Sequence, residues 1–188
     1  MIKPATQHKG EVRLIGGLWK RSKLAVADRP GLRPTPDRVR ETLFNWLGPD
    51  LSGWHVLDAF AGTGALGFEA ASRGAADVWL LERDAVLVAS LEAVKQRLAA
   101  SAVTVLRVDA MAWMPRATAE KFELVLLDPP FDSGLAAAAA LAAQRLLAVG
   151  GYLYVETPQP LATPPAGCAL HRSLKAGAVH AQLWQRQT

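Results

Sequence analysis

The sequence predicts a doubly wound α/β domain with a mostly parallel sheet, and three patterns lead to this class. From residue 54 onward, short apolar runs alternate with segments of helical periodicity, as successive βαβ units require. A glycine-rich turn at residues 62–67 directly follows the first apolar run, the place where open α/β sheets bind ligands. After residue 155, two further runs around a short turn predict a C-terminal antiparallel hairpin at the sheet edge.

The strands of the parallel sheet are expected at runs rich in valine, leucine and aromatic residues, namely 54–60, 77–81, 103–108, 122–127 and 152–155. Helices are expected between them at 65–73, 84–100 and 135–148. The second of these has leucine or valine at steps of four, three and four, which forms one apolar face: Leu87, Leu91, Val94 and Leu98. Gly150-Gly151 is expected to end the third helix, and the closing hairpin is expected at 168–174 and 179–186.

The first fifty residues form a unit of a different kind. Segments 12–15 and 18–26 flank Gly16-Gly17 and predict a small basic hairpin or an extended arm. In the helix that follows, Thr35 can be the N-cap and Pro36 can occupy the first turn. Its apolar stripe leaves Arg38 and Arg40 free to point elsewhere; the stripe consists of Val39, Leu43 and Leu47. We therefore expect a basic N-terminal extension at 1–50 and an α/β domain over 51–188.

Charge and composition restrict the class further. The 188 residues include 21 basic and 17 acidic ones, a net charge of +4, and residues 1–50 hold ten of the basic and five of the acidic ones. A nearly neutral body with a basic arm favours a nucleic acid partner on one side, although a solvated basic tail would have the same composition. The single cysteine, Cys168, excludes a disulfide scaffold. Without a secretory signal or an apolar segment long enough for a membrane, we expect a cytoplasmic protein.

The glycine motif, Gly62-x-Gly64-x-x-Gly67, is preceded by Asp58 and followed by Glu82. Its spacing matches a dinucleotide fingerprint, and it also suits the nucleoside half of S-adenosylmethionine. Asp58 favours the second ligand, because a carboxylate in this turn repels a pyrophosphate by about 1 kcal/mol or more. The same carboxylate attracts the ammonium and sulfonium groups of S-adenosylmethionine, and Glu82 can accept both ribose hydroxyls in either case. A turn that only packs a helix on a strand is disfavoured by the two acids.

Two further acids follow predicted strands. Asp109 comes after the third strand, where it could accept a hydrogen bond from an adenine amino group or equally cap a short helix. Asp128-Pro129-Pro130-Phe131 comes after the fourth. The prolines have no N–H, so the carbonyls and the Asp128 carboxylate only accept hydrogen bonds. This suits a planar amino group on a base that stacks on Phe131; the alternative is an Asp-Pro turn beside a core phenylalanine.

Together these motifs resemble a known family. The order of glycine motif, Glu82, Asp109 and Asp128-Pro-Pro-Phe is similar to that of Rossmann-like S-adenosylmethionine-dependent methyltransferases acting on an exocyclic amine. Four segments further resemble the bacterial small-subunit (16S) ribosomal RNA guanine-N2 methyltransferases: 13–24, 32–47, 57–67 and 127–131. The resemblance implies methyl transfer from S-adenosylmethionine to guanine N2 in ribosomal RNA or an assembling small ribosomal subunit, with the base unstacked. We expect a monomer without a metal.

The resemblance also implies roles for individual residues. The catalytic residues would be Asp128, Pro129, Pro130 and Phe131. The cofactor-binding residues would be Asp58, Phe60, Gly62, Thr63, Gly64, Glu82, Arg83, Asp109 and Ala110. The residues that contact RNA, with an indole available for stacking, would be Arg13, Trp19, Lys20, Arg21, Lys23, Arg33, Arg38 and Arg40.

Three alternative functions stay open in the sequence. A DNA or RNA adenine-N6 methyltransferase could use a similar loop, but the DNA enzymes usually carry a target-recognition domain, for which 188 residues leave no room. A dinucleotide oxidoreductase is opposed by Asp58. A non-catalytic RNA-binding protein of the same fold is not excluded by any motif. No metal site is expected, because the four histidines show no ligand spacing.

Overall fold

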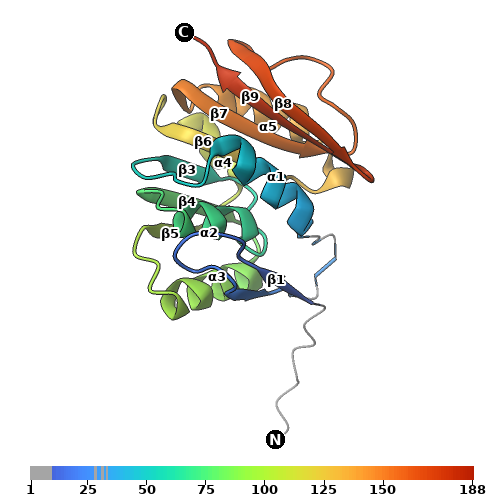
Figure 1. Cartoon of the computed structure of the whole chain (residues 1–188). Coiled ribbons are helices and arrows are strands. Elements are labelled where there is room, and N and C mark those ends of the chain that lie inside the picture. Colours follow the sequence, from blue (N-terminus) through green and yellow to red (C-terminus); the bar gives the residue numbers. More distant parts are fainter. Residues whose placement is uncertain (1–9, 28, 31, 33) are drawn as a thin grey trace, which may run out of the picture.

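The computed structural model describes residues 10–27, 29, 30, 32 and 34–188 and is built around a seven-stranded sheet (Figure 1). The strand order is β5-β4-β3-β6-β7-β9-β8, with β3 to β7 parallel and β9 antiparallel to both neighbours. The strands are β3 (His55–Asp58), β4 (Asp77–Glu82), β5 (Val103–Arg107), β6 (Phe122–Leu127), β7 (Leu147–Thr157), β8 (Cys168–Ala176) and β9 (Val179–Arg186). The predicted doubly wound α/β class and its C-terminal hairpin are confirmed.

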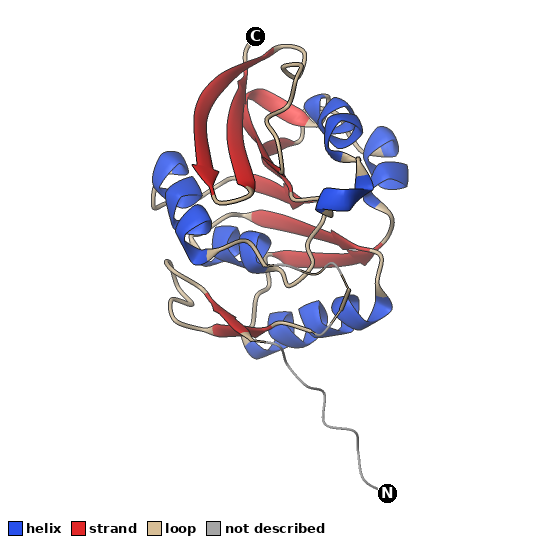
Figure 2. Cartoon of the chain, turned by 90° about the vertical axis from the view of Figure 1, so that its right-hand side faces the viewer, coloured by secondary structure: helices blue, strands red, loops and turns tan. Residues whose placement is uncertain are grey.

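Helices cover both faces of this sheet, as the view along it shows (Figure 2). They are α1 (Asp37–Leu47), α2 (Ala65–Ser72), α3 (Ala85–Arg97), α4 (Ala110–Trp113) and α5 (Ala136–Gln144), with short 3-10 turns η1 (Met114–Arg116) and η2 (Phe131–Ser133). Successive side chains of a strand point to opposite faces. In β6, Leu124 and Leu126 therefore join the cluster under α1, α2 and α3, whereas Val125 and Leu127 join the cluster under α4 and α5.

The end of the third predicted helix was wrong. We expected Gly150-Gly151 to cap a helix over 135–148, but α5 ends at Gln144 and both glycines lie within β7. The pairing of β6 with β7 shifts between Phe122 and Leu124, which marks a bulge in β7. A Cβ on Gly151 would lie 2.9–3.1 Å from three backbone oxygens. Gly151 therefore permits close approach of the backbone, Gly150 adopts a positive φ of +78°, and neither glycine ends a helix.

The N-terminal hairpin, β1 (Glu11–Arg13) and β2 (Lys23–Ala25), is present and packs against α2. Buried Glu69 of α2 accepts the N–H groups of Ile15 and Gly16, each at 2.8 Å, and the Arg73 Nε at 2.9 Å. Val12 and Leu24 enter the same hydrophobic cluster as strands β3 and β4. The division into parts at residue 50 thus stays a prediction about function, because both parts share one core.

The N-cap of α1 was also predicted wrongly. Pro36 occupies the cap position, and no side chain of the described residues caps this helix end. Thr35 is instead buried and turned toward the sheet. Val39 and Leu43 are buried, as the periodicity predicted. Within the described part of the chain, none of the helices has both the length and the apolar character needed to cross a bilayer.

Candidate cofactor and substrate site

Asp58 ends β3 and is almost completely buried. Its Oδ2 accepts the Gly67 N–H at 3.0 Å, whereas its Oδ1 has no hydrogen bond of normal geometry to any described residue. Burial raises the pKa of the Asp58 carboxyl to about 7, an effect that the N–H groups of Gly67 and Phe60 only partly offset. Glu82 and Glu156 raise it further. An unpartnered, buried carboxylate oxygen favours a cationic ligand and disfavours a pyrophosphate.

The glycine turn connects β3 to α2 in a tightly packed arrangement. Gly62 and Gly64 have φ values of +54° and +79°, a region that favours glycine. A Cβ on Gly67 would lie 2.1 Å from Leu80 and 3.2 Å from Asp58 Oδ2. The third glycine therefore allows α2 to approach β4, and the first two shape the turn in front of Asp58.

Glu82, at the end of β4, holds this turn in place. Its Oε2 accepts the Gly62 N–H at 3.1 Å, and its Oε1 accepts the Asp84 N–H at 2.9 Å. Thr63 Oγ1 accepts the Ala65 N–H at 3.3 Å, and Arg83 is exposed beside the turn. Glu82 thus lies at the expected place next to the glycines, and its contact with a ribose stays a prediction.

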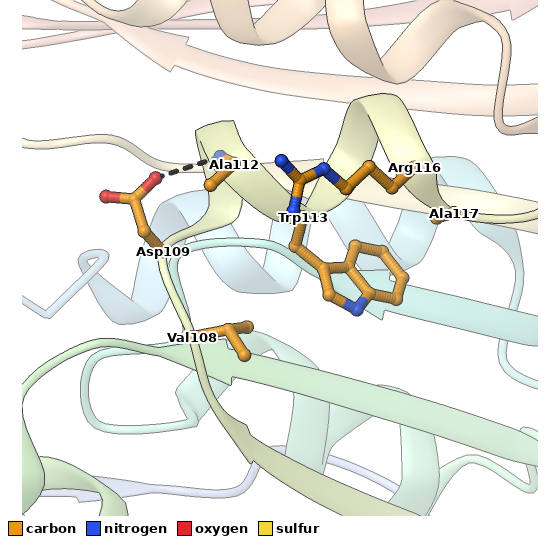
Figure 3. Close-up of a pocket in the computed structure, with 6 residues that line it drawn as sticks. All are labelled: Val108, Asp109, Ala112, Trp113, Arg116 and Ala117. Atoms are coloured by element: carbon orange, nitrogen blue, oxygen red, sulfur yellow. Dashed lines mark hydrogen bonds between the residues drawn. The ribbon is translucent and has the colours of Figure 1, made fainter.

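Asp109 follows β5 and caps α4. Its Oδ1 accepts the Ala112 N–H at 3.0 Å (Figure 3). The next residue, Ala110, is buried. The carboxylate lies at the rim of an open hollow of about 320 Å³. The hollow is lined by Val108, Asp109, Ala112, Trp113, Arg116 and Ala117. The capping role is established by this geometry, and the hydrogen bond to an adenine stays a prediction.

The Asp128-Pro-Pro-Phe turn follows β6 at the same edge of the sheet. Asp128 Oδ2 accepts a hydrogen bond from Thr35 Oγ1 at 3.2 Å. Pro129 is buried, Pro130 is exposed, and the half-buried Phe131 begins η2. Burial raises the pKa of the Asp128 carboxyl well above its ordinary value, and the nearby Glu156 raises it further. The turn offers acceptors and part of an aromatic surface, as the sequence predicted.

The sequence analysis missed Glu156 and misassigned Thr35. Glu156 lies near the end of β7, is 2% exposed and accepts the Tyr154 hydroxyl at 2.8 Å. It influences the pKa of both Asp58 and Asp128, so three carboxyls from adjacent strands β3, β6 and β7 face one another. The sequence did contain a signal for Glu156, because this residue follows the apolar run 152–155, just as Asp58 and Asp128 follow apolar runs. This acidic edge fits a ligand that carries positive charge and an amino group.

The residues expected to contact RNA separate into three groups. Arg13, Lys20, Arg21, Lys23 and Arg38 are exposed, and Trp19 is half-buried. Arg33 lies outside the described residues. Arg40 was predicted wrongly, because its side chain is fully buried and its guanidinium group contacts Asp37, the Arg13 carbonyl and Glu69. A group enclosed in this way cannot reach a phosphate in this conformation.

The hairpin loop is not beside the acidic edge. The Leu18 N–H donates to the Ser72 carbonyl at 2.7 Å, and the Trp19 N–H donates to Ser72 Oγ at 2.9 Å. Ser72 is the last residue of α2, which begins at the glycine turn and runs back along the sheet. The loop that carries Trp19, Lys20 and Arg21 therefore lies near the amino-terminal ends of the parallel strands, whereas Asp128 lies at their carboxyl ends. Among the residues that the structure describes, no cluster of His, Cys, Asp or Glu could hold a metal ion.

Comparison with known proteins identifies relatives over the full length. A family model described as Conserved hypothetical protein 95 matches residues 12–185. Proteins named Ribosomal RNA small subunit methyltransferase D are 42% identical in Escherichia coli, over 100% of this chain and 96% of the relative, and 41% identical in Haemophilus influenzae, over 94% and 95%. The solved structure of yhhF from Escherichia coli superposes with a TM-score of 0.84 at 39% identity, covering 95% of this chain and 99% of that one.

More distant structures share the fold alone. An RNA methyltransferase from Salinibacter ruber, solved in complex with S-adenosyl-L-homocysteine, is 16% identical with a TM-score of 0.64, covering 82% of this chain and 94% of that one. The match of the family model and the full-length relatives agree with the motifs at the carboxyl ends of β3 and β6. The chain therefore belongs to the Conserved hypothetical protein 95 family and is a methyltransferase.

Proposed function

We propose that this methyltransferase transfers a methyl group from S-adenosylmethionine to the exocyclic N2 of a guanine in small-subunit (16S) ribosomal RNA. The observation that carries the proposal is the acidic edge itself, where buried Asp58 lies near an acceptor-only turn at Asp128. The names of the full-length relatives support ribosomal RNA of the small subunit as the substrate class. The choice of guanine N2 rests on the resemblance of the motifs to those of guanine-N2 methyltransferases, because the turn at Asp128 could equally hold an adenine amino group.

The residues around Asp58 fit the proposed cofactor. The Asp58 carboxylate, whose Oδ1 accepts no hydrogen bond of normal geometry from the described residues, would face the positively charged methionyl part. Glu82 would face the ribose. Gly62 and Gly64 leave the backbone open to close approach by a ligand. When bound, S-adenosylmethionine supplies the electrophilic methyl group. Asp109, Ala110 and Arg83 would surround the adenine.

The turn at Asp128 is suited to hold an amino group. Guanine N2 has two N–H donors, and the turn supplies two acceptors, the Asp128 carboxylate and the Pro129 carbonyl. One oxygen of the Asp128 carboxylate also accepts the Thr35 hydroxyl. Phe131 provides a ring on which the base can stack, a contact worth about 1–3 kcal/mol. The raised pKa of the Asp128 carboxyl makes it a stronger base than an ordinary aspartate. It is therefore suited to take up the proton that the amine loses, and positioning would supply much of the rate.

The exposed cations would bind the RNA backbone. Arg13, Lys20, Arg21, Lys23 and Arg38 are the exposed cations of the N-terminal extension that would contact phosphates. The loop at 20–23 lies near the amino-terminal ends of the parallel strands and Asp128 lies at their carboxyl ends. One RNA substrate that touches both must therefore extend along the face of the sheet that α2 covers. This requirement fits a large folded RNA.

The proposal is tested by incubating the protein with radiolabelled S-adenosylmethionine and small ribosomal subunits from cells that lack the enzyme, followed by mapping of the labelled base. We expect one labelled guanine, methylated at N2. Asp128→Ala should abolish labelling while S-adenosylhomocysteine still raises the melting temperature. Labelled adenine N6, or stabilisation by NAD in place of S-adenosylhomocysteine, would contradict the proposal.

A further inference from the structure

Asp128 and Glu156 occupy equivalent positions on neighbouring parallel strands. Leu127 of β6 and Val155 of β7 are register partners, so Asp128 and Glu156 are the next pair along. Leu126 and Tyr154 belong to the cluster under α1 and α2. By the alternation of strands, Asp128 and Glu156 point to that same face. Two carboxyls thus lie side by side beneath the segment that leads into α1.

Thr35 lies between this pair and α1. Its side chain is 5% exposed, and its hydroxyl donates to Asp128 Oδ2 at 3.2 Å. The same side chain also favours the ionised form of Glu156. Thr35 therefore contacts the proposed catalytic residue Asp128 from a segment that is 93 residues away in sequence. It joins the N-terminal extension directly to the reaction site.

The charged groups around Asp128 and Glu156 determine at which pH each of the two carboxyls loses its proton. Asp58 on β3 faces Asp128, and on the other side Glu156 contacts Tyr154 and lies near Arg40 of α1. Asp58 and Glu156 are buried and Asp128 is half-buried. The one guanidinium group near them is already bound to Asp37 and the Arg13 carbonyl. Like charges in a site with little water cannot all ionise near neutral pH, so the three carboxyls together retain a proton.

We propose that Glu156 and Thr35 are positioning residues that decide when Asp128 is ionised, and hence the pH range in which it can hold a substrate amine. Glu156 accepts the Tyr154 hydroxyl and lies near Arg40, so it carries the negative charge first and Asp128 retains the shared proton to higher pH. The Thr35 hydroxyl stabilises Asp128 once it ionises. The inference rests on the proposed function for the role of Asp128, but the protonation of the pair is a property of the protein alone.

The test compares the pH dependence of kcat for methyl transfer in two isosteric variants. Glu156→Gln removes a negative charge beside Asp128, so the acidic limb of the profile should move to lower pH by about one unit. Thr35→Val removes the donor that stabilises ionised Asp128, so the limb should move to higher pH by about half a unit. Opposite shifts are expected only if both residues act on the ionisation of Asp128.

Three controls keep the result interpretable. Thr35→Ser restores the hydroxyl and should restore the wild-type limb, and Glu92→Gln removes a carboxylate on α3 outside the site and should leave it unchanged. If Glu156→Gln fails to fold, Tyr154→Phe removes the donor to Glu156 Oε1. This variant should move the limb in the same direction as Glu156→Gln by a smaller amount.

A second measurement needs no substrate. The carboxyl carbon of Asp128, assigned by comparison with Asp128→Asn, is titrated by NMR in the wild type and both variants. We expect the same opposite shifts there, even if the methylated base is not guanine. Unchanged limbs and titrations, or shifts of both variants in one direction, would overturn the inference, whereas failure of the proposed function alone would alter only the identity of the product.

Discussion

Replacement of Asp58 by asparagine should change how the stability of the protein depends on pH. Burial raises the pKa of this carboxyl from 3.8 to about 7, and each unit corresponds to about 1.4 kcal/mol. The folded state therefore binds the proton more tightly than the unfolded state, so the free energy of unfolding falls as pH rises through this window. Between about pH 4 and pH 8, Asp58 alone should cost the wild type roughly 4 kcal/mol.

Asp58→Asn removes this cost, because the amide does not titrate and its oxygen can still accept the Gly67 N–H. Urea denaturation of both proteins at several pH values should give a stability difference that grows in favour of the variant as pH rises. The same variant should lose its thermal stabilisation by S-adenosylhomocysteine, since the negative charge is gone. If the two pH profiles run parallel, Asp58 is ionised at ordinary pH and the account of its burial fails.

Three other perturbations test separate parts of the structure. Glu69→Ala leaves Arg73 without its carboxylate and leaves buried Arg40 with Asp37 alone. The free energy of unfolding should fall by at least about 3 kcal/mol in urea denaturation. A loss below about 1 kcal/mol, roughly that of an exposed ion pair, would contradict the importance of these contacts. Gly17→Ala should destabilise the protein by at least about 1 kcal/mol more than Gly53→Ala in the same assay. Both glycines have a positive φ, but only at Gly17 would the new Cβ meet a backbone oxygen, Ser72 O, at 1.8 Å. Equal losses would contradict the close contact between this loop and α2. The double change of Lys20 and Arg21 to glutamine should reduce the slope of log K for RNA binding against log salt concentration by about 1 to 2. The control Arg172→Gln, on the exposed strand β8, should not change this slope. An unaltered slope in the double variant would show that the RNA binds at another surface.

The sequence was informative wherever local pattern and position act together. Apolar runs followed by an acid predicted Asp58, Glu82 and Asp128 at the carboxyl edge of the sheet, because parallel strands must all end there. The glycine spacing predicted a tight turn, and Gly67 indeed lies where a side chain would meet Leu80 and Asp58. These inferences need only the chain direction and the period of the strands.

The failures involve contacts between distant segments. Arg40 follows Val39 on the buried side of α1, and its burial depends on Glu69 of another helix. Thr35 precedes Pro36, as an N-cap residue would, but its hydroxyl donates a hydrogen bond to Asp128 and not to the helix end. Gly150-Gly151 reads as a helix end and is a bulge opposite β6. In each case the deciding partner is far away in the chain, where periodicity gives no information.

The attachment of the hairpin to α2 limits how this enzyme can be engineered. Glu69, Ser72 and Arg73 belong to the α/β part, yet Glu69 and Ser72 bind the backbone of the loop at 15–19 and Arg73 lies against Gly16. A chimera that exchanges only the first fifty residues between relatives would leave these anchors facing an unmatched loop. Transfer of RNA specificity would therefore require grafting the end of α2 together with the extension.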